Sequence, residues 1–135
     1  LMVQSLAVVI LAAGKGTRMN NPNKAKVMFE LSGKPMIDYV VQQAESLAPK
    51  RIVAVVGFQK ESVMEYLSRE FPGRLEYAHQ DVQLGTGHAV QQAEPLLQGF
   101  EGDVLILSGD VPLLRRETLA AFAEAHRTQK SAVSV

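Results

Sequence analysis

The chain has 135 residues, of which 47% are hydrophobic and 21% are charged, and this is the balance of one globular domain with a sizeable core. Its 14 basic residues balance its 14 acidic residues, so there is no global positive field, and we expect neither nucleic acid nor a membrane as a partner. Because the chain contains no cysteine, disulfides, thiolate catalysis and thiolate-ligated zinc are excluded.

The first predicted element lies in the longest apolar run, Leu6 to Ala13. This run is too short to span a bilayer, and no basic segment precedes it as a signal peptide requires. We therefore expect a cytoplasmic protein.

Short apolar runs alternate with helical patterns along the chain. Strands are predicted at Leu6 to Ala12, Ile52 to Val56, Leu75 to Ala78 and Val104 to Leu107. Apolar residues recur at helical spacing from Met36 to Leu47, Val63 to Phe71, Val90 to Leu97 and Leu119 to His126, with Pro35 suited to a first helical turn. Strands that are apolar on both faces and alternate with helices predict a doubly wound α/β fold with a mostly parallel sheet. Residues 131–135 have the composition of an opening fifth strand, an odd end for a complete domain.

In such a fold ligands bind at the carboxyl ends of the strands, and the first of these ends leads into a glycine-rich loop. Gly14 and Gly16 allow backbone amides to approach a phosphate, although a plain strand-to-helix turn would also explain them. A dinucleotide-binding fingerprint is excluded because Met19 stands where its third glycine is needed, and the spacing of a P-loop is not met either.

The same loop is rich in positive charge. Lys15, Arg18, Lys24 and Lys26 lie within twelve residues of one another. In a chain without net charge this cluster indicates a binding site for a polyanion, and the alternative is a solvated basic loop.

The loop after the third strand contains Gly85, Thr86 and Gly87 and leads into a helix. Free amides at a helix start suit a polar base edge or an anion, while Thr86 also suits the role of helix N-cap. The side-chain amides of Gln80 and Gln83 both donate and accept hydrogen bonds, as the edge of uracil requires.

The loop after the fourth strand contains Asp110, a hard oxygen ligand where a phosphate-bound Mg²⁺ would lie. The alternative is an Asx-turn before Pro112. The histidines lack the spacing of a metal cluster, so we assign structural or supporting roles to His79, His88 and His126.

Taken together, the three loops closely resemble those of the sugar-nucleotide pyrophosphorylases, and among them the bacterial N-acetylglucosamine-1-phosphate uridylyltransferases. The resemblance is carried by Leu11 to Met19, Lys26 and Val27, Gln80, Gln83 to Ala89, and Gly109 to Leu113. The first motif also resembles cytidylyl- and guanylyltransferases, whereas the other two are narrower. The implied fold is the Rossmann-like nucleotide-diphospho-sugar transferase type.

The resemblance also implies roles for individual residues. Arg18 and Lys26 match catalytic cations on the triphosphate, and Asp110 matches the magnesium ligand. The implied nucleotide-binding residues are Leu11, Ala12, Ala13, Gly14, Lys26, Gln80, Gly85, Thr86, Ser108, Gly109 and Asp110. Among these, Gln80, Gly85 and Thr86 match positions that read uracil.

The implied activity is a Mg²⁺-assisted, in-line attack of N-acetylglucosamine-1-phosphate on the α-phosphate of UTP. This transfer forms UDP-N-acetylglucosamine, a cell wall precursor, and pyrophosphate. Family members continue with residues that bind the sugar and supply a second magnesium ligand, so we expect residues 1–135 to be the nucleotide-binding part of a truncated domain, without the β-helix acetyltransferase of bifunctional members. Two alternatives stay open: a nucleotide-binding module without turnover, and a related cytidylyl- or guanylyltransferase.

Overall fold

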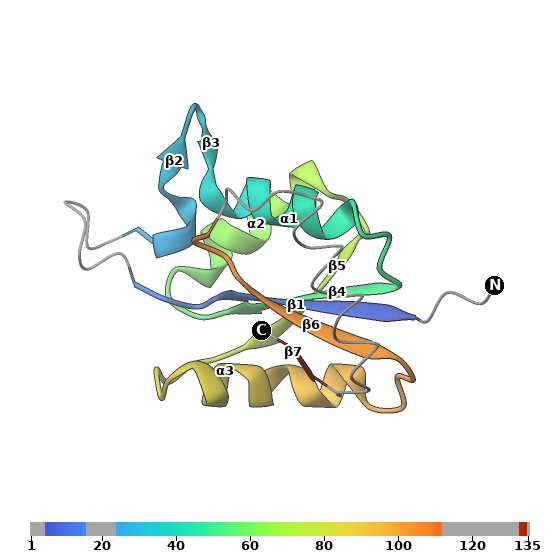
Figure 1. Ribbon diagram of the computed structural model, residues 1–135. Helices are drawn as coiled ribbons and strands as arrows, with labels where there is room; N and C mark the ends of the chain where they lie inside the picture. The colour runs from blue at the N-terminus through green and yellow to red at the C-terminus, as the bar shows by residue number, and fades with distance from the viewer. Residues whose placement is uncertain (1–4, 16–23, 112–132, 135) are drawn as a thin grey trace.

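A five-stranded parallel sheet runs through the computed structural model, which describes residues 5–15, 24–111 and 133–134 (Figure 1). The strands are β1 (Leu6–Ala12), β4 (Arg51–Val56), β5 (Leu75–His79), β6 (Asp103–Ser108) and β7 (Val133–Ser134). They lie in the order β5-β4-β1-β6-β7, and every neighbouring pair is parallel. The predicted doubly wound α/β fold is confirmed, including the fifth strand, of which two residues are described.

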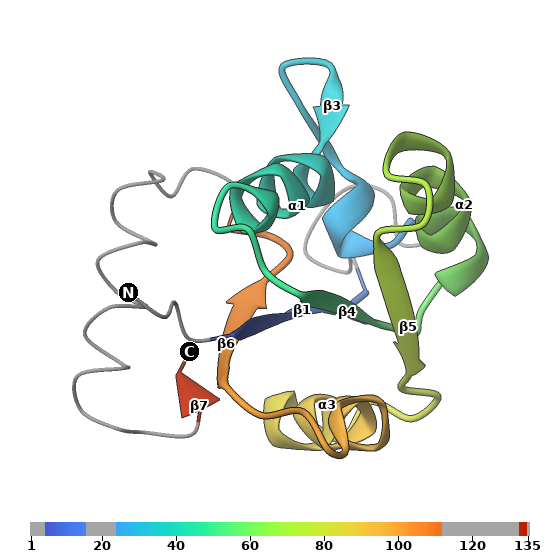
Figure 2. The same cartoon turned by 90° about the vertical axis from the view of Figure 1, so that its right-hand side faces the viewer.

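Helices cover both faces of this sheet. They are α1 (Met36–Glu45), α2 (Lys60–Glu70) and α3 (Thr86–Ala93), together with the short 3₁₀ helices η1 (Lys26–Met28) and η2 (Glu94–Leu97). Figure 2 shows α1 and α2 on one side of the sheet and α3 on the other.

The alternation of side chains along β1 explains the two layers. Val8 and Ile10 belong to the core cluster that contains α1 and α2 residues, whereas Val9 belongs to the cluster that contains Ala89 and Ala93 of α3. Because successive side chains of a strand point to opposite faces, an uninterrupted apolar strand requires apolar cover on both sides. The sheet therefore lies between two hydrophobic layers.

Two details of the predicted helices were wrong. Thr86 is not the N-cap of α3: that position is taken by Gly85 at φ 99°, no side chain caps the helix end, and Thr86 is its first helical residue. Glycine adopts this backbone conformation without steric cost, which explains why Gly85, and not a residue with a hydroxyl group, takes the N-cap position. Pro35 is the N-cap residue of α1 and not part of its first turn.

The predicted helix over Val90 to Leu97 is also divided. It is α3 up to Ala93 and the 3₁₀ helix η2 from Glu94, and the change coincides with Pro95, which lacks the amide hydrogen of an α-helix interior. The helix predicted over Leu119 to His126 lies outside the described residues.

A hairpin that the sequence did not predict projects from the body beside α1. Its strands are β2 (Glu30–Leu31) and β3 (Lys34–Pro35), and the turn residues Ser32 and Gly33 have φ angles of 54° and 86°. Two consecutive positive φ angles define a type I′ turn, which matches the twist of paired strands. In the described part of the chain, no helix is long and apolar enough to cross a membrane.

Candidate nucleotide site

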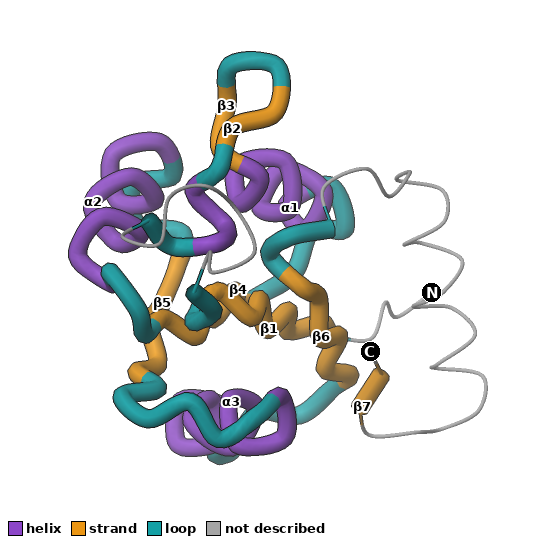
Figure 3. The backbone as a smooth tube through the Cα atoms, turned by 90° about the vertical axis from the view of Figure 1, so that its left-hand side faces the viewer, coloured by secondary structure: helices purple, strands orange, loops and turns teal. Residues whose placement is uncertain are grey.

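The strand order reverses beside β1. From β1 the chain builds β4 and then β5 on one side, and β6 and then β7 on the other. Loops that leave the carboxyl ends of β1 and β6 therefore separate at this point and leave a crevice between them. Figure 3 looks onto this end of the sheet.

A cleft of about 270 Å³ occupies the crevice. Three loops, the start of α3 and η1 provide its lining. The lining residues are Leu11, Ala13, Gly14, Lys26, Val27, Gln80, Gln83, Gly85, Thr86, Ala89, Ser108 and Asp110. The three loops that the sequence singled out thus meet in one place.

The charged end of the cleft is an ion pair between Lys26 and Asp110. Lys26 Nζ lies 2.6 Å from Asp110 Oδ2, and Ser108 Oγ donates to Asp110 Oδ1. Burial raises the pKa of Asp110, but the hydrogen bonds from Lys26 and Ser108 and the charge of Lys26 together hold it below its ordinary value. Asp110 is therefore a carboxylate at neutral pH.

Backbone contacts fix the position of Lys26. Its amide donates to the carbonyl of Gly14 at 3.1 Å, and the preceding Ala25 forms an isolated antiparallel bridge with Lys15. These contacts connect the two described segments of the first loop, which end at Lys15 and begin again at Lys24. A Cβ on Gly14 would meet nothing within 4 Å, so the backbone there is open on the side of the added atom.

The opposite wall of the cleft carries amide side chains. Gln80 is 3% exposed, and its Nε2 donates to the Gly85 carbonyl at 3.2 Å and lies 3.0 Å from His88 Nδ1. Gln83 Nε2 donates to the Ala13 carbonyl at 2.9 Å and thereby ties the third-strand loop to the first. This wall offers polar groups suited to a base edge.

The lining contains most of the predicted site residues. Leu11, Ala13, Gly14, Lys26, Gln80, Gly85, Thr86, Ser108 and Asp110 line the cleft. Ala12 and Gly109 lie beside it: Ala12 is buried in the core, and Gly109 packs against Leu11 and Val27. Arg18 lies outside the described residues.

Three lining residues, Val27, Gln83 and Ala89, were not among the site residues predicted from the sequence. Val27 and Ala89 are apolar; Val27 is the middle residue of η1, and Ala89 lies in the first half of α3. Both residues belong to the stretches that carry the family resemblance, and this was the signal that could have assigned them to the site.

The side chains that line the cleft include one that could bind Mg²⁺. Within the described residues, no group of three or more acidic or histidine side chains is arranged to hold a metal ion. Mg²⁺ in nucleotide sites needs only one or two carboxylates, because phosphate oxygens and water complete its shell. Asp110, ionised and lining the cleft, fits such a site as its single described carboxylate.

Comparison with known proteins agrees with the resemblance noted from the three loops. Residues 8–135 match the model of the MobA-like NTP transferase domain. The chain is 51% identical over 131 residues to the bifunctional protein GlmU of Anaeromyxobacter dehalogenans and 44% identical over 130 residues to that of Nostoc sp.. Each alignment covers 96% of this chain but only 27% or 28% of the relative, so the chain spans about a quarter of the length of these proteins.

Solved structures share the fold. A nucleotidyl transferase from Methanothermobacter thermautotroptrophicus is 25% identical with a TM-score of 0.74, covering 89% of this chain and 57% of its own. A UDP-glucose pyrophosphorylase complexed with UDP-glucose is 21% identical with a TM-score of 0.76, covering 93% of this chain and 55% of its own. The chain therefore belongs to the family of MobA-like NTP transferase domains.

Proposed function

We propose that the cleft binds UTP with Mg²⁺ and serves the transfer of the uridylyl group to N-acetylglucosamine-1-phosphate in the cytoplasm. The observation that carries the proposal is the lining of one cleft by a cationic lysine with an ionised aspartate after β6 and by a buried amide after β5, with β4 and β1 between these two strands. A nucleoside triphosphate has the same polarity, with charge at one end and a hydrogen-bonding base at the other. The match to the MobA-like NTP transferase domain supports nucleotidyl transfer as the class of reaction.

In the proposed reaction a phosphate oxygen of the sugar-1-phosphate forms a bond to the α-phosphorus of UTP. The bond from that phosphorus to the bridging oxygen breaks, and pyrophosphate leaves with the electron pair. No side chain needs to act as a nucleophile, because in-line phosphoryl chemistry depends on positioning and charge. Lys26 stabilises negative charge on the phosphates, and Arg18 is the proposed second cation.

Asp110 would hold the Mg²⁺, whose charge adds to that of the cations when it is bound. The backbone from Leu11 to Gly14 would carry the base and phosphates, and Gln80, Gly85 and Thr86 would contact the base. Ser108 orients the Asp110 carboxylate through its hydrogen bond.

The alternative is a nucleotide-binding module without turnover. The chain spans only 27% or 28% of the GlmU relatives that it matches, so turnover by residues 1–135 is itself part of the proposal. Such a module would bind nucleotide at the same cleft.

Calorimetric titration with UTP and Mg²⁺, followed by a pyrophosphate-release assay with N-acetylglucosamine-1-phosphate, distinguishes the two functions. Binding with release supports the transferase, and binding without release supports the module. The absence of binding would contradict both. Competition among the four nucleoside triphosphates tests the remaining possibility, a cytidylyl- or guanylyltransferase.

A further inference from the structure

The side-chain amide of Gln80 is held in one orientation. Gln80 is 3% exposed although it lines the cleft. Its Nε2 lies 3.2 Å from the carbonyl oxygen of Gly85, which accepts hydrogen bonds and cannot donate them. The two ends of an amide have nearly the same shape but opposite hydrogen-bonding character. Whatever fixes the orientation of Gln80 therefore determines what it offers to a ligand.

His88 provides the second contact to the same nitrogen. Its Nδ1 lies 3.0 Å from Gln80 Nε2, and because the amide nitrogen is a donor, Nδ1 must accept. This requires a neutral imidazole. The two hydrogens of Nε2 then have two acceptors, Gly85 O and His88 Nδ1. The hydrogen-bonding capacity left to the Gln80 amide is that of Oε1, which is an acceptor.

His88 is the better anchored of the two partners. It lies on α3, whose Ala89 and Ala93 are buried against the sheet. One turn further on, Gln92 Nε2 donates to the His88 carbonyl at 3.1 Å. The ring Nε2, 3.3 Å from the same amide nitrogen, carries the imidazole hydrogen when Nδ1 accepts, so this second contact is not a hydrogen bond to Gln92. Gly85, in contrast, belongs to an exposed loop, and its bond to Gln80 is at the long end of the normal range.

The chemistry of the pyrimidine bases gives this arrangement a consequence. Uracil carries a hydrogen on N3 and donates there, whereas the N3 of cytosine carries a lone pair and accepts. We propose that His88 is a positioning residue: it keeps the acceptor end of Gln80 available to the base and so sets the preference for UTP over CTP. This inference rests on the proposed function, since it assumes that UTP binds in the cleft.

The test compares UTP and CTP binding, each with Mg²⁺, by calorimetry on the full 135-residue chain. His88→Leu replaces the acceptor with an apolar side chain. We expect the dissociation constant of CTP divided by that of UTP to fall by about fivefold to tenfold. His88→Asn places a carbonyl oxygen near the position of Nδ1 and should retain the wild-type ratio. Gln91→Leu, an exposed site on the same helix, is the matched control and should change nothing.

Failure of the role of His88 and failure of the proposed function give different results. If His88→Leu keeps the wild-type ratio of the CTP and UTP dissociation constants, the inference is overturned and the proposed function stands. The same conclusion follows if the ratio falls as far in His88→Asn as in His88→Leu. A wild-type chain that does not prefer UTP would overturn the proposed function and the inference with it. Circular dichroism checks folding, and if His88→Leu does not fold, His88→Phe keeps the ring volume and is judged by the same ratio.

Discussion

At the scale of single residues, the charge of the cleft depends on a partner brought from another part of the chain. Asp110 follows β6, and the ammonium 2.6 Å from it belongs to Lys26 at the start of η1. Burial alone would raise the pKa of Asp110, and the contacts with Lys26 and Ser108 lower it beyond that effect. A carboxyl group with a lowered pKa in the folded state stabilises the fold above its ordinary pKa and loses that contribution as the pH falls through the lowered value.

Replacing Lys26 by Met tests this balance. The substitution removes both a hydrogen bond and a positive charge, so the pKa of Asp110 should rise relative to the wild type, while Ser108 still holds it partly down. The measurement is an NMR titration of the Asp110 carboxyl carbon in both chains. An unchanged pKa would show that the pair does not form in solution.

Gly109 is closely surrounded at the place where the strand order reverses beside β1. Its amide donates to the carbonyl of Leu11 at 2.9 Å, and an added Cβ would lie 2.8 Å from Val27 Cγ1 and 2.9 Å from that same carbonyl oxygen. Neither neighbour moves freely, since one is backbone and the other a buried side chain.

Gly109→Ala should therefore lower the free energy of unfolding by about 1–3 kcal/mol through overpacking. The matched control is Gly87→Ala in α3, where an added Cβ meets nothing within 4 Å. Alanine there should stabilise the helix by about 0.5–1 kcal/mol. Urea denaturation of the two variants and the wild type gives both values, and equal stabilities would contradict the packing argument.

Single residues of the site were predictable from the sequence where chemistry alone identifies them. Both Asp110, after an apolar strand, and Lys26, in a basic loop, line the same cleft, while their roles toward a nucleotide stay predictions. Their contact was not predicted, because a distance between side chains depends on the path of the whole loop. Gly109 was predicted to bind the nucleotide, and this stays a prediction; its close packing against Leu11 and Val27 was not indicated by the glycine motif.

At the scale of elements, the strands were predicted within about one residue because apolar runs of this length leave few alternatives. The β2–β3 hairpin was missed because each of its strands has only two residues, too few for any periodicity. Ser32 and Gly33 were its one signal, a dipeptide typical of tight turns.

The contact between α1 and α2 also depends on a feature that periodicity does not reveal. Asp38 is a buried carboxylate on the inner side of α1, and it accepts hydrogen bonds from Tyr66 of α2 at 2.5 Å and from Gln42. Burial raises the pKa of Tyr66, and the hydrogen bond to Asp38 raises it further. The hydroxyl therefore stays protonated and continues to donate.

Tyr66→Phe should lower the free energy of unfolding by about 1–3 kcal/mol, because it leaves a buried carboxylate with one donor fewer. Tyr77→Phe removes a hydroxyl whose contact, with Ser68 Oγ at 3.1 Å, is exposed, and its effect should stay within about 0.5 kcal/mol. Chemical denaturation at neutral pH compares the two. Similar losses of unfolding free energy in the two variants would show that burial of the contact with Asp38 does not determine how much it stabilises the fold.

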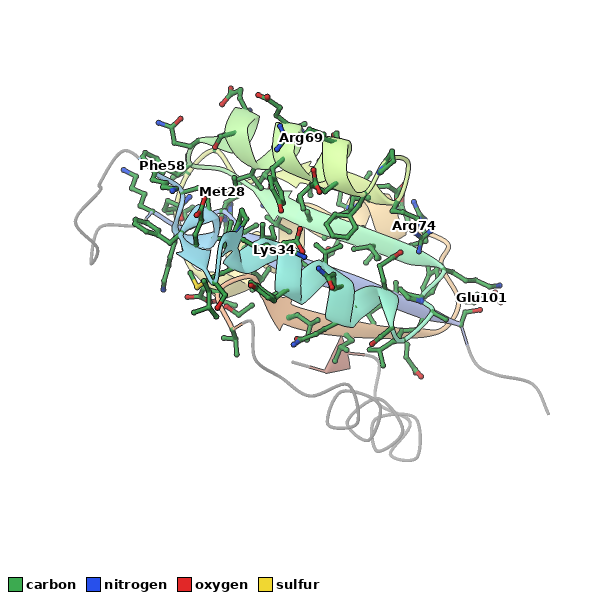
Figure 4. The ribbon with its side chains drawn as sticks, turned by 90° about the horizontal axis from the view of Figure 1, so that it is seen from above. Met28, Lys34, Phe58, Arg69, Arg74 and Glu101 are labelled. Carbon is green, nitrogen blue, oxygen red and sulfur yellow. The ribbon has the colours of Figure 1, made fainter. Side chains whose placement is uncertain are left out.

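At the scale of the whole molecule, the two ends of the sheet differ in how their charges are arranged. At the carboxyl end Lys15 lies 5.2 Å from the ring centre of Phe58, and Lys26 faces the cleft. At the amino end Arg51 is paired with Glu76 through two nitrogens, at 2.9 and 2.6 Å. Figure 4 shows Phe58 at one end of the molecule and Arg74 and Glu101 at the other.

A balanced net charge therefore conceals an uneven distribution. The arginines of the amino end are satisfied by carboxylates, since Arg74 is held by Glu45 in the same bidentate manner. The loop that opens the carboxyl end holds four cations within twelve residues. Among the described residues of that loop, Lys15 and Lys24 lie over aromatic rings and form no described ion pair, so a polyanion should be attracted to this end.

Location predicts different results for two cations that each form an ion pair of the same length, 2.6 Å: Lys26 lines the cleft at the carboxyl end, and Arg51 lies at the amino end. Lys26→Met should weaken UTP binding by about tenfold or more, because a charge-assisted contact to phosphate is lost. Arg51→Met should leave the UTP dissociation constant within about twofold of the wild type, since Arg51 lies at the amino end of β4, and exposed pairs of its kind contribute little to stability. Titration of both variants with UTP and Mg²⁺ measures the two effects side by side. Equal losses would mean that general positive charge attracts the nucleotide, whereas a loss confined to Lys26→Met places the binding energy at the carboxyl end of the sheet.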